Sequence, residues 1–230
     1  MGTSREHNRA QVTAAILASA RAQLSKVGPA ELSLRSVARD VGMVSSAIYR
    51  YFPSRNNLLT ALLITCYDEL GMAAEAVDDP LAKPVDRWVA ICYAARAWAL
   101  THPHEYALLY GSPVIGYVAP PDTIGPGTRV VLALARVIID AHPTTPPSAG
   151  RGFSGIVDRA SQVANGLDAT APDLSSELVG RALIAWASLF GTISFELWGQ
   201  LTGSVSDYDA WFTEVALRLA ADLGLSQSTA

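Results

Sequence analysis

Six apolar side chains near the end of the chain follow one another at spacings of four, three, four, three and four residues. They are Val179, Leu183, Trp186, Phe190, Ile193 and Leu197. A period of about 3.5 residues predicts a long helix that packs against another helix at a shallow angle. The opposite side of the same stretch is also apolar, so we expect this helix, over residues 175–201, to be covered on most sides.

Spacings typical of helices recur along almost the whole chain, whereas the alternation typical of strands is scarce. We therefore predict an all-α fold. The predicted helices span residues 9–27, 34–41, 45–52, 55–76, 85–101, 103–110, 128–141, 175–201 and 206–223. Loops rich in glycine and proline are expected over 111–127 and 143–152, and residues 78–84 are a predicted linker.

Several helix starts carry a serine, whose hydroxyl can accept a hydrogen bond from a free main-chain amide. The predicted caps are Ser33, Ser54 and either Ser45 or Ser46, and Ser206 with Asp209 fits a capping box. Gly42 follows the second helix, at a place where glycine permits the positive φ of a tight turn. These signals predict two short helices joined by a tight turn.

Charge is divided unevenly between the two ends of the chain. Residues 1–62 hold eight Arg and Lys against three acids, a net charge of +5, although the whole chain carries −4. The remaining residues therefore carry −9, and no acid occurs between Val41 and Tyr67. Chance clustering on a solvated surface is one reading, and a basic head that meets a polyanion is the other.

The second helix, the turn at Gly42 and the third helix form a candidate helix-turn-helix. In this motif the short second helix lies in the major groove of DNA, with its first residues at the base edges. Here those residues are Ser45, Ser46 and Ala47, which are small. Serine can bond to several base edges and alanine can touch a thymine methyl group, so these three residues are predicted base readers.

The aromatic and basic residues that follow divide between the core and the surface. Ile48 and Phe52 are four residues apart, so they share one helix face, which we assign to the core. Tyr49, Arg50 and Tyr51 are assigned to the surface. A purely structural role in packing a small domain would explain Ile48 and Phe52 alone. The absence of carboxylates from this segment also favours contact with phosphate.

Residues 32–63, "LSLRSVARDVGMVSSAIYRYFPSRNNLLTALL", resemble the DNA-binding domain of the tetracycline repressor (TetR) family. The resemblance covers residues 9–63. It implies that Tyr49, Tyr51 and Arg55 hold phosphates. Arg35 and the three small residues at 45–47 would read bases, and Arg50 would face either base or backbone. Two residues depart from the family pattern: Val44 stands where serine is frequent, and Arg55 stands where lysine is usual.

The resemblance also implies a domain organisation. Residues 1–63 would form the DNA-binding domain, and residues 64–230 would form a helical domain for ligand binding and dimerisation. The partners expected are a double-stranded DNA operator, a small hydrophobic or aromatic effector, and a second copy of the chain bound through the last two helices. Residues 185–199 and 110–120 resemble a subfamily with a Trp-His-Gly signature, although Phe190 stands in place of its histidine.

The C-terminal half is rich in aromatic residues, which can line a pocket for an apolar or aromatic ligand or simply fill the core. The family implies a cavity beside the fifth and sixth helices. We therefore predict Trp88, Trp98 and Tyr110 as ligand-binding residues.

Other chemistry has little support in the sequence. His102 and His104 flank a proline without further ligands nearby, and no phosphate-binding glycine loop or nucleophile motif occurs. We expect no metal, no cofactor and no enzymatic activity. Cys66 and Cys92 are predicted to be buried, reduced thiols. The apolar run at 182–195 is too short to span a bilayer, so a cytoplasmic protein without membrane contact is expected.

The combined prediction is a ligand-responsive DNA-binding transcriptional regulator, most simply a repressor released from a palindromic operator by a small hydrophobic molecule. One alternative is an all-α small-molecule-binding protein or enzyme that does not act on DNA, which would leave the basic head unexplained. A TetR-type activator is the other alternative, and the sequence does not separate activation from repression.

Overall fold

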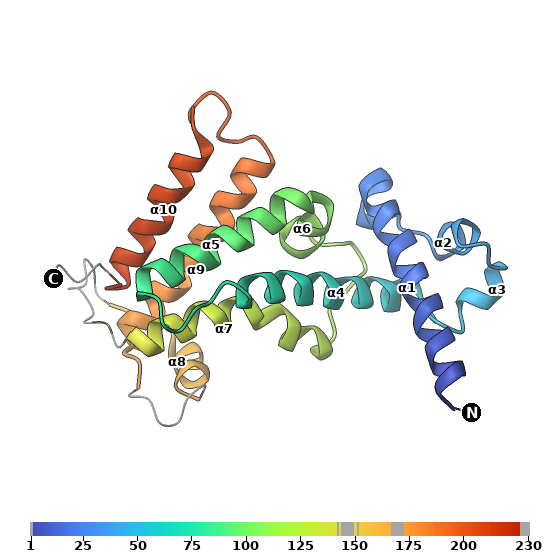
Figure 1. Ribbon diagram of the computed structural model, residues 1–230, viewed down its shortest axis with the longest axis horizontal. Helices are drawn as coiled ribbons and strands as arrows, with labels where there is room; N and C mark the ends of the chain where they lie inside the picture. The colour runs from blue at the N-terminus through green and yellow to red at the C-terminus, as the bar shows by residue number, and fades with distance from the viewer. Residues whose placement is uncertain (1, 142, 144–149, 151, 167–172, 226–230) are drawn as a thin grey trace. The chain divides into compact units, whose positions relative to one another are not determined.

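The structure is a computed structural model that describes residues 2–141, 143, 150, 152–166 and 173–225. Every regular element in these residues is helical, which confirms the all-α prediction (Figure 1). The α-helices are α1 (Gly2–Val27), α2 (Leu34–Asp40), α3 (Ser45–Ile48), α4 (Arg55–Glu75), α5 (Pro84–Thr101), α6 (Pro103–Tyr110), α7 (Ile124–Ala141), α8 (Asp158–Asn165), α9 (Ser176–Leu197) and α10 (Tyr208–Asp222). Two short 3₁₀ helices cover Pro29–Glu31 and Pro121–Thr123.

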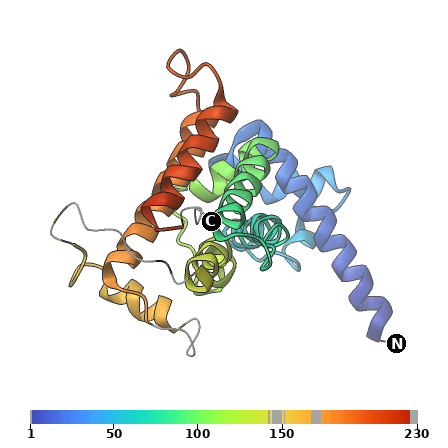
Figure 2. The same ribbon diagram turned by 60° about the vertical axis from the view of Figure 1, so that its left-hand side comes forward.

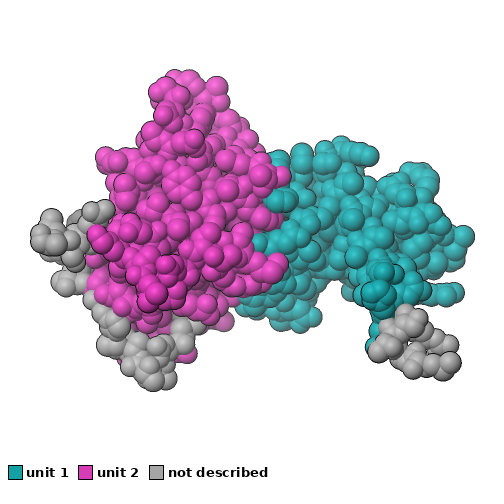
Figure 3. All heavy atoms as spheres, viewed as in Figure 1, with its two compact units in different colours: residues 1–69, 102–127 teal, residues 70–101, 128–230 magenta. Residues whose placement is uncertain are grey.

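The chain forms two compact units, which are coloured separately in Figure 3. Unit 1 contains Met1–Glu69 and His102–Gly127, and unit 2 contains Leu70–Thr101 and Thr128–Ala230. Unit 1 thus includes α6 and the following loop as well as the N-terminal helices. Helices α4 and α7 each begin in unit 1 and end in unit 2.

The core of unit 1 is built from the apolar stripes of α1 to α4. Its buried members include Ile16, Ala20, Leu24, Val37, Ala38, Ile48, Phe52, Leu58, Leu59 and Leu62. Ile48 is fully buried and Phe52 is nearly so, which confirms their assignment to the core. Because α2 and α3 are each shorter than three turns, their stability depends on this shared packing rather than on their own hydrogen bonds.

An ion pair joins α6 to the rest of unit 1. Arg21 on α1 donates from Nη1 to Oε1 of Glu69 on α4 over 2.7 Å, and from Nε to Oε1 of Glu105 on α6 over 3.2 Å. Cys66 is buried beside this cluster and is a free thiol, as predicted. Burial raises the pKa of the Cys66 thiol to about 12, so the group is neutral at physiological pH.

Unit 2 is centred on α5, which packs against α9 and α10. The buried Arg96 guanidinium of α5 binds both carboxylate oxygens of Glu196 on α9, each over 2.7 Å. The same guanidinium donates to Asp209 on α10 over 2.6 Å. Helices α9 and α10 lie side by side in both views of the chain (Figure 2). One arginine therefore ties together three helices that are distant in sequence.

Several helix boundaries differ from the sequence predictions. Helix α9 ends at Leu197 instead of residue 201, because the chain turns at Gly199, where φ is 74°. The last helix is capped by Asp207, which accepts from the amide of Ala210 over 2.9 Å, so the predicted capping box at Ser206 is wrong. Helix α7 begins at Ile124, four residues early, and α8 was not predicted.

Helix α9 is, in the described part of the chain, the one helix long and apolar enough to cross a membrane. Half of its most apolar stretch is nevertheless buried inside the fold. It also carries Arg181, which pairs with Glu177 over 2.9 Å and with Asp222 over 2.6 Å. These are features of the core helix of a globular domain, which passes the same test of length and composition.

Candidate functional site

Helices α2 and α3 are joined by a tight turn over residues 41–44. Gly42 adopts a φ of 70°, as the sequence predicted for this position. The amide of Met43 donates to the carbonyl of Ala38 over 2.8 Å and closes the end of α2. The turn therefore fixes where α3 begins, which is the property that a helix-turn-helix needs in order to place its recognition helix.

The predicted serine caps have different outcomes in the structure. Ser54 accepts from the amide of Asn57 over 3.2 Å and caps α4, as predicted. Ser33 is the N-cap residue of α2, as predicted, but its side chain makes no capping hydrogen bond in the described structure. Helix α3 is capped by Val44, whose side chain cannot accept a hydrogen bond, so neither Ser45 nor Ser46 is the cap.

Helix α3 is shorter than the sequence predicted. Its α-helical residues end at Ile48, and the chain then continues to Phe52 in tight turns. The amides of Arg50 and Tyr51 bond to carbonyls three residues earlier, over 3.2 Å and 2.9 Å. The residues after Ile48 are therefore presented from turns rather than from a continuous helix.

Most of the predicted DNA-binding residues lie at the surface of unit 1. The exposed ones are Arg35, Ser45, Ser46, Tyr49 and Arg50, and the half-buried ones are Ala47, Tyr51 and Arg55. Tyr49 exposes 43% of its surface, although large apolar rings are usually covered. The base-reading and phosphate-binding roles of these residues remain predictions.

Arg9 of α1 is a residue that the sequence reasoning did not select for this surface. Its guanidinium carbon lies 5.4 Å from the centroid of the Tyr51 ring, which is a cation–π contact. It also donates from Nη2 to the carbonyl of Arg50 over 3.4 Å. Arg9 is exposed, so its positive charge adds to that of Arg50 on this surface. No local motif could have identified it, because the contact joins residues more than forty positions apart.

Arg55 makes contacts that its predicted phosphate role does not require. Its Nε donates to the carbonyl of Leu32 over 3.0 Å, and its Nη2 donates to the carbonyls of Pro29 and Ala30 over 2.5 Å and 2.8 Å. These carbonyls belong to the short segment between α1 and α2. Arg55 therefore clamps that segment to the start of α4, and its contact with phosphate stays a prediction.

The nearest acid in sequence, Asp40, is engaged by side chains of α1. Its Oδ2 accepts from Gln23 Nε2 over 3.0 Å and from Ser19 Oγ over 3.4 Å. Beyond Asp40, the stretch from Val41 to Tyr67 adds no further carboxylate that could repel phosphate.

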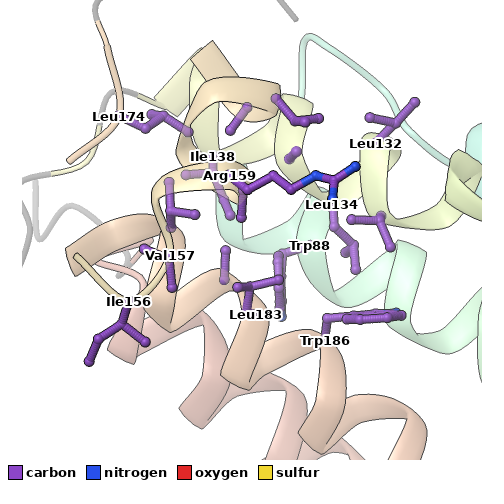
Figure 4. A pocket seen from close by; sticks show the side chains of 17 residues that line it. Trp88, Leu132, Leu134, Ile138, Ile156, Val157, Arg159, Leu174, Leu183 and Trp186 are labelled. Carbon is purple, nitrogen blue, oxygen red and sulfur yellow. The ribbon is translucent and has the colours of Figure 1, made fainter. Parts of the chain in front are cut away.

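Unit 2 contains a cavity of about 500 Å³ between α5, α7, α8 and α9 (Figure 4). Its lining is almost wholly apolar. The residues are Trp88, Val131, Leu132, Leu134, Ala135, Ile138, Ile156, Val157, Arg159, Ala160, Val163, Ala164, Leu174, Val179, Ala182, Leu183 and Trp186. A cavity of this size and composition is typical of a site for one small apolar molecule.

The three predicted ligand residues have different positions. Trp88 lies on the cavity wall, and its Nε1 donates to the carbonyl of Ala216 over 3.1 Å. Trp98 is buried on α5 but is not among the lining residues described. Tyr110 belongs to unit 1, where its ring packs against Tyr67 and Tyr106 at 6.2 Å and 5.1 Å between centroids. The rings of Trp98 and Tyr110 therefore contribute to packing inside their own units, which is the commoner use of an aromatic residue at helical spacing.

The sequence reasoning missed most of the cavity wall. Aliphatic residues of α7, α8 and α9 form it, with Trp186 as a second aromatic residue. Helical periodicity indicates which side chains are buried, but it does not show which of them face an empty space. No cluster of three or more potential metal ligands occurs in the described residues.

A helical chain with a helix-turn-helix in one unit and an apolar cavity in the other has the architecture of a DNA-binding transcriptional regulator. Residues 16–62 match the profile of the bacterial regulatory proteins of the tetR family, and residues 88–219 match that of the tetracyclin repressor-like C-terminal domain. The chain belongs to the TetR family of transcriptional regulators, which are not enzymes. The Trp-His-Gly subfamily remains a prediction.

Similar proteins are known over most of the chain. The HTH-type transcriptional regulator Rv1816 of Mycobacterium tuberculosis is 41% identical over 207 residues, which cover 85% of each protein. The regulator Mb1846 of Mycobacterium bovis gives the same values. Among solved structures, the regulatory protein SCO4313 superposes with a TM-score of 0.78 at 30% identity, covering 94% of this chain and 98% of that one.

Proposed function

We propose that the protein is a cytoplasmic, dimeric repressor that leaves its operator when a small hydrophobic molecule enters the cavity of unit 2. The observation that carries this proposal is the apolar cavity of about 500 Å³ in the same chain as a helix-turn-helix whose turn and recognition helix lie in an acid-free stretch, from Val41 to Tyr67. Membership of a DNA-binding family sets aside the alternative of a carrier or enzyme that does not act on DNA.

The DNA-binding step uses the surface around α3. Two copies of the chain would place two α3 segments in successive major grooves of a near-palindromic site. Ser45, Ser46 and Ala47 would contact base edges, and Tyr49, Tyr51 and Arg55 would contact phosphates. Arg50 would face either base or backbone. Arg35 at the start of α2 would contribute to base reading. Phosphate contacts supply much of such affinity, so binding should weaken steeply with salt.

The release step uses the cavity. A ligand shifts a protein between two states only if it binds one of them more tightly. Helices α4 and α7 each contain residues of both units, and α7 contributes several of the cavity's lining residues. A molecule that favours a different position of α7 would therefore act on an element that continues into unit 1.

The dimer would form through the outer faces of α9 and α10. Large apolar side chains are exposed here, namely Ile184 and Phe195 on α9, Trp198 directly after α9, and Trp211 and Leu217 on α10. A run of this kind on two adjacent helices is unusual for a surface that faces water. It fits a four-helix contact with a second copy of the same two helices.

The test combines DNA binding with transcription. Full-length protein is titrated against its own promoter region by fluorescence anisotropy, and a reporter fused to that promoter is compared with and without the gene. Repression predicts higher reporter activity when the gene is deleted. Lower activity would identify an activator, and absence of specific DNA binding would contradict the proposal as a whole.

A cavity variant tests the ligand step. Ala182→Phe places a ring in the cavity, whereas Arg136→Leu alters the exposed face of α7 outside the lining. A compound that releases DNA from the wild type and from the Arg136 variant, but not from the Ala182 variant, must act through the cavity. Equal release from all three proteins would locate its action elsewhere.

A further inference from the structure

The cavity of unit 2 contains one charged residue among its described lining, Arg159 of α8. Figure 4 shows its side chain extended from α8, with the guanidinium group toward Leu132 and Leu134 of α7. Arg159 is an exposed residue that also belongs to the lining, so it stands where the cavity meets solvent. Among the described residues, the cavity therefore has an apolar interior and one positive group at its opening.

Three buried arginines of unit 2 have clear structural roles. Arg87 pairs with Asp78 over 2.6 Å, Arg96 holds Glu196 and Asp209, and Arg181 holds Glu177 and Asp222. Each joins carboxylates of neighbouring helices or loops. Arg159, by contrast, makes no ion pair and no side-chain hydrogen bond within the described residues. Its guanidinium group is thus available to an acceptor that comes from outside this part of the chain.

A second donor in the wall points to the same ligand chemistry. The Nε1 atom of Trp186 is buried and has no hydrogen-bond partner among the described residues, whereas that of Trp88 is satisfied by Ala216. The polar side-chain groups of the described lining are therefore donors, without an acceptor among them. Such a wall favours a ligand that carries acceptor atoms over one that carries donors or a positive charge.

We propose that this cavity binds an amphipathic carboxylate, with its apolar body against α7, α8 and α9 and its carboxylate on Arg159. The planar guanidinium group matches a carboxylate and can bind it through two parallel hydrogen bonds. One arginine balances one negative charge, so a monoanion fits this opening better than a phosphate dianion. The inference rests on the proposed function only in that the cavity is a ligand site.

The test compares three probes that share a ten-carbon chain. Decanoate, decan-1-ol and decyltrimethylammonium are titrated by calorimetry into the full-length wild type and its Arg159→Leu variant. We expect the wild type to bind decanoate roughly tenfold more tightly than decanol, a difference of about 1.4 kcal/mol. In the variant, the affinity for decanoate should fall to that for decanol. The affinity for decanol should stay as in the wild type, which also shows that the cavity is still folded.

Two further variants distinguish a specific effect of the Arg159 guanidinium group from an effect of positive charge in general. Arg136→Leu removes another exposed arginine of the cavity-forming helix α7 and should leave all three affinities unchanged. Arg159→Lys should retain part of the preference for decanoate, because it keeps the charge but loses the planar fork. Equal wild-type affinities, a preference that survives Arg159→Leu, or no binding of any probe would overturn the inference.

The operator titration distinguishes this inference from the proposed function. If decanoate binds through Arg159 but does not change affinity for DNA, the ligand class stands and ligand-controlled release fails. If decanol releases DNA as well as decanoate does, from the wild type and from Arg159→Leu alike, release stands and the carboxylate assignment fails.

Discussion

The guanidinium group of Arg9 lies over the ring of Tyr51, 5.4 Å from its centroid, and so brings a charge from α1 to the surface around α3. We expect Arg9→Ala to weaken binding to every operator variant to a similar extent, because a phosphate contact carries no sequence information. The slope of log K against log salt should fall by about 0.9 for the lost contact. Fluorescence anisotropy at several salt concentrations measures both quantities.

Lys26→Ala is the matched control for this prediction. Lys26 is also an exposed basic residue of α1, but it lies at the other end of the helix. Its removal should leave the salt slope unchanged. If both variants lose the same affinity, the effect comes from net charge alone and the assignment of Arg9 to the DNA surface is wrong.

Arg55 is expected to matter for stability. Arg55→Gln removes hydrogen bonds to the carbonyls of Pro29, Ala30 and Leu32. The bonds to Pro29 and Leu32 are part-buried, and a buried acceptor left unpaired costs about 1–3 kcal/mol. Urea unfolding should show this loss in the absence of DNA. Arg50→Ala, an exposed arginine of the same surface, should leave the unfolding free energy within about 0.5 kcal/mol. A stable Arg55 variant with weakened DNA binding would instead favour the phosphate role.

Arg9 and Arg55 show how much of the candidate DNA surface could be predicted from the sequence. Local spacing correctly placed Ile48 and Phe52 in the core and Tyr49 at the surface, because residues four apart share a helix face. The contacts of Arg9 and Arg55 join segments that only the fold brings together. No pattern within one helix specifies them, and the phosphate role of Arg55 came from a resemblance rather than from its surroundings.

The C-terminal half was less predictable for a similar reason. The apolar seam of α9 and the presence of α5, α7 and α10 followed from periodicity. Trp88, one of the predicted ligand residues, lies on the cavity wall, and its contact with a ligand stays a prediction. Helix α8 was missed because its eight residues are mostly polar or small. The cavity depends on which aliphatic side chains fail to meet one another, and that is a property of three-dimensional packing.

The outer face of α9 provides a prediction about assembly. Ile184 and Phe195 are 48% and 51% exposed, and eleven residues, or about three turns, bring them to one face. Phe195→Glu should shift the protein from dimer to monomer in analytical ultracentrifugation and weaken operator binding. A charge at a desolvated contact is costly. Leu81→Glu is the control, since Leu81 is 96% exposed in the turn before α5. A dimeric Phe195 variant would exclude this face.

The buried arginine of α5 should be far more important for folding than an exposed one. Arg96→Ala leaves Glu196 without its partner, and removal of one member of a buried ion pair costs about 3–5 kcal/mol. Arg218→Ala breaks an exposed pair with Glu214 on α10, which contributes at most about 1 kcal/mol. Urea unfolding of both variants gives the comparison. Similar losses for the two would show that the Arg96 contacts do not stabilise unit 2.

The ion pair between α4 and α7 predicts a dependence on pH. Arg129 donates from Nε to Oε1 of Glu75 over 2.9 Å, and this hydrogen bond lowers the pKa of the Glu75 carboxyl group. A carboxyl group with a lowered pKa in the folded state stabilises the protein above its ordinary pKa. That stabilisation is lost as pH falls through the lowered value.

Glu75→Gln therefore tests this dependence on pH, because the direction of its effect on the free energy of unfolding is known in advance. At pH 7 the variant should be less stable than the wild type, by no more than about 1 kcal/mol because the pair is partly exposed. The difference should shrink as pH falls below the ordinary range of a glutamate and disappear once Glu75 is protonated in the folded state. Glu214→Gln, from the exposed pair on α10, should show a smaller difference throughout. If the effect of Glu75→Gln is constant from pH 3 to 7, its charge is not what joins α4 to α7.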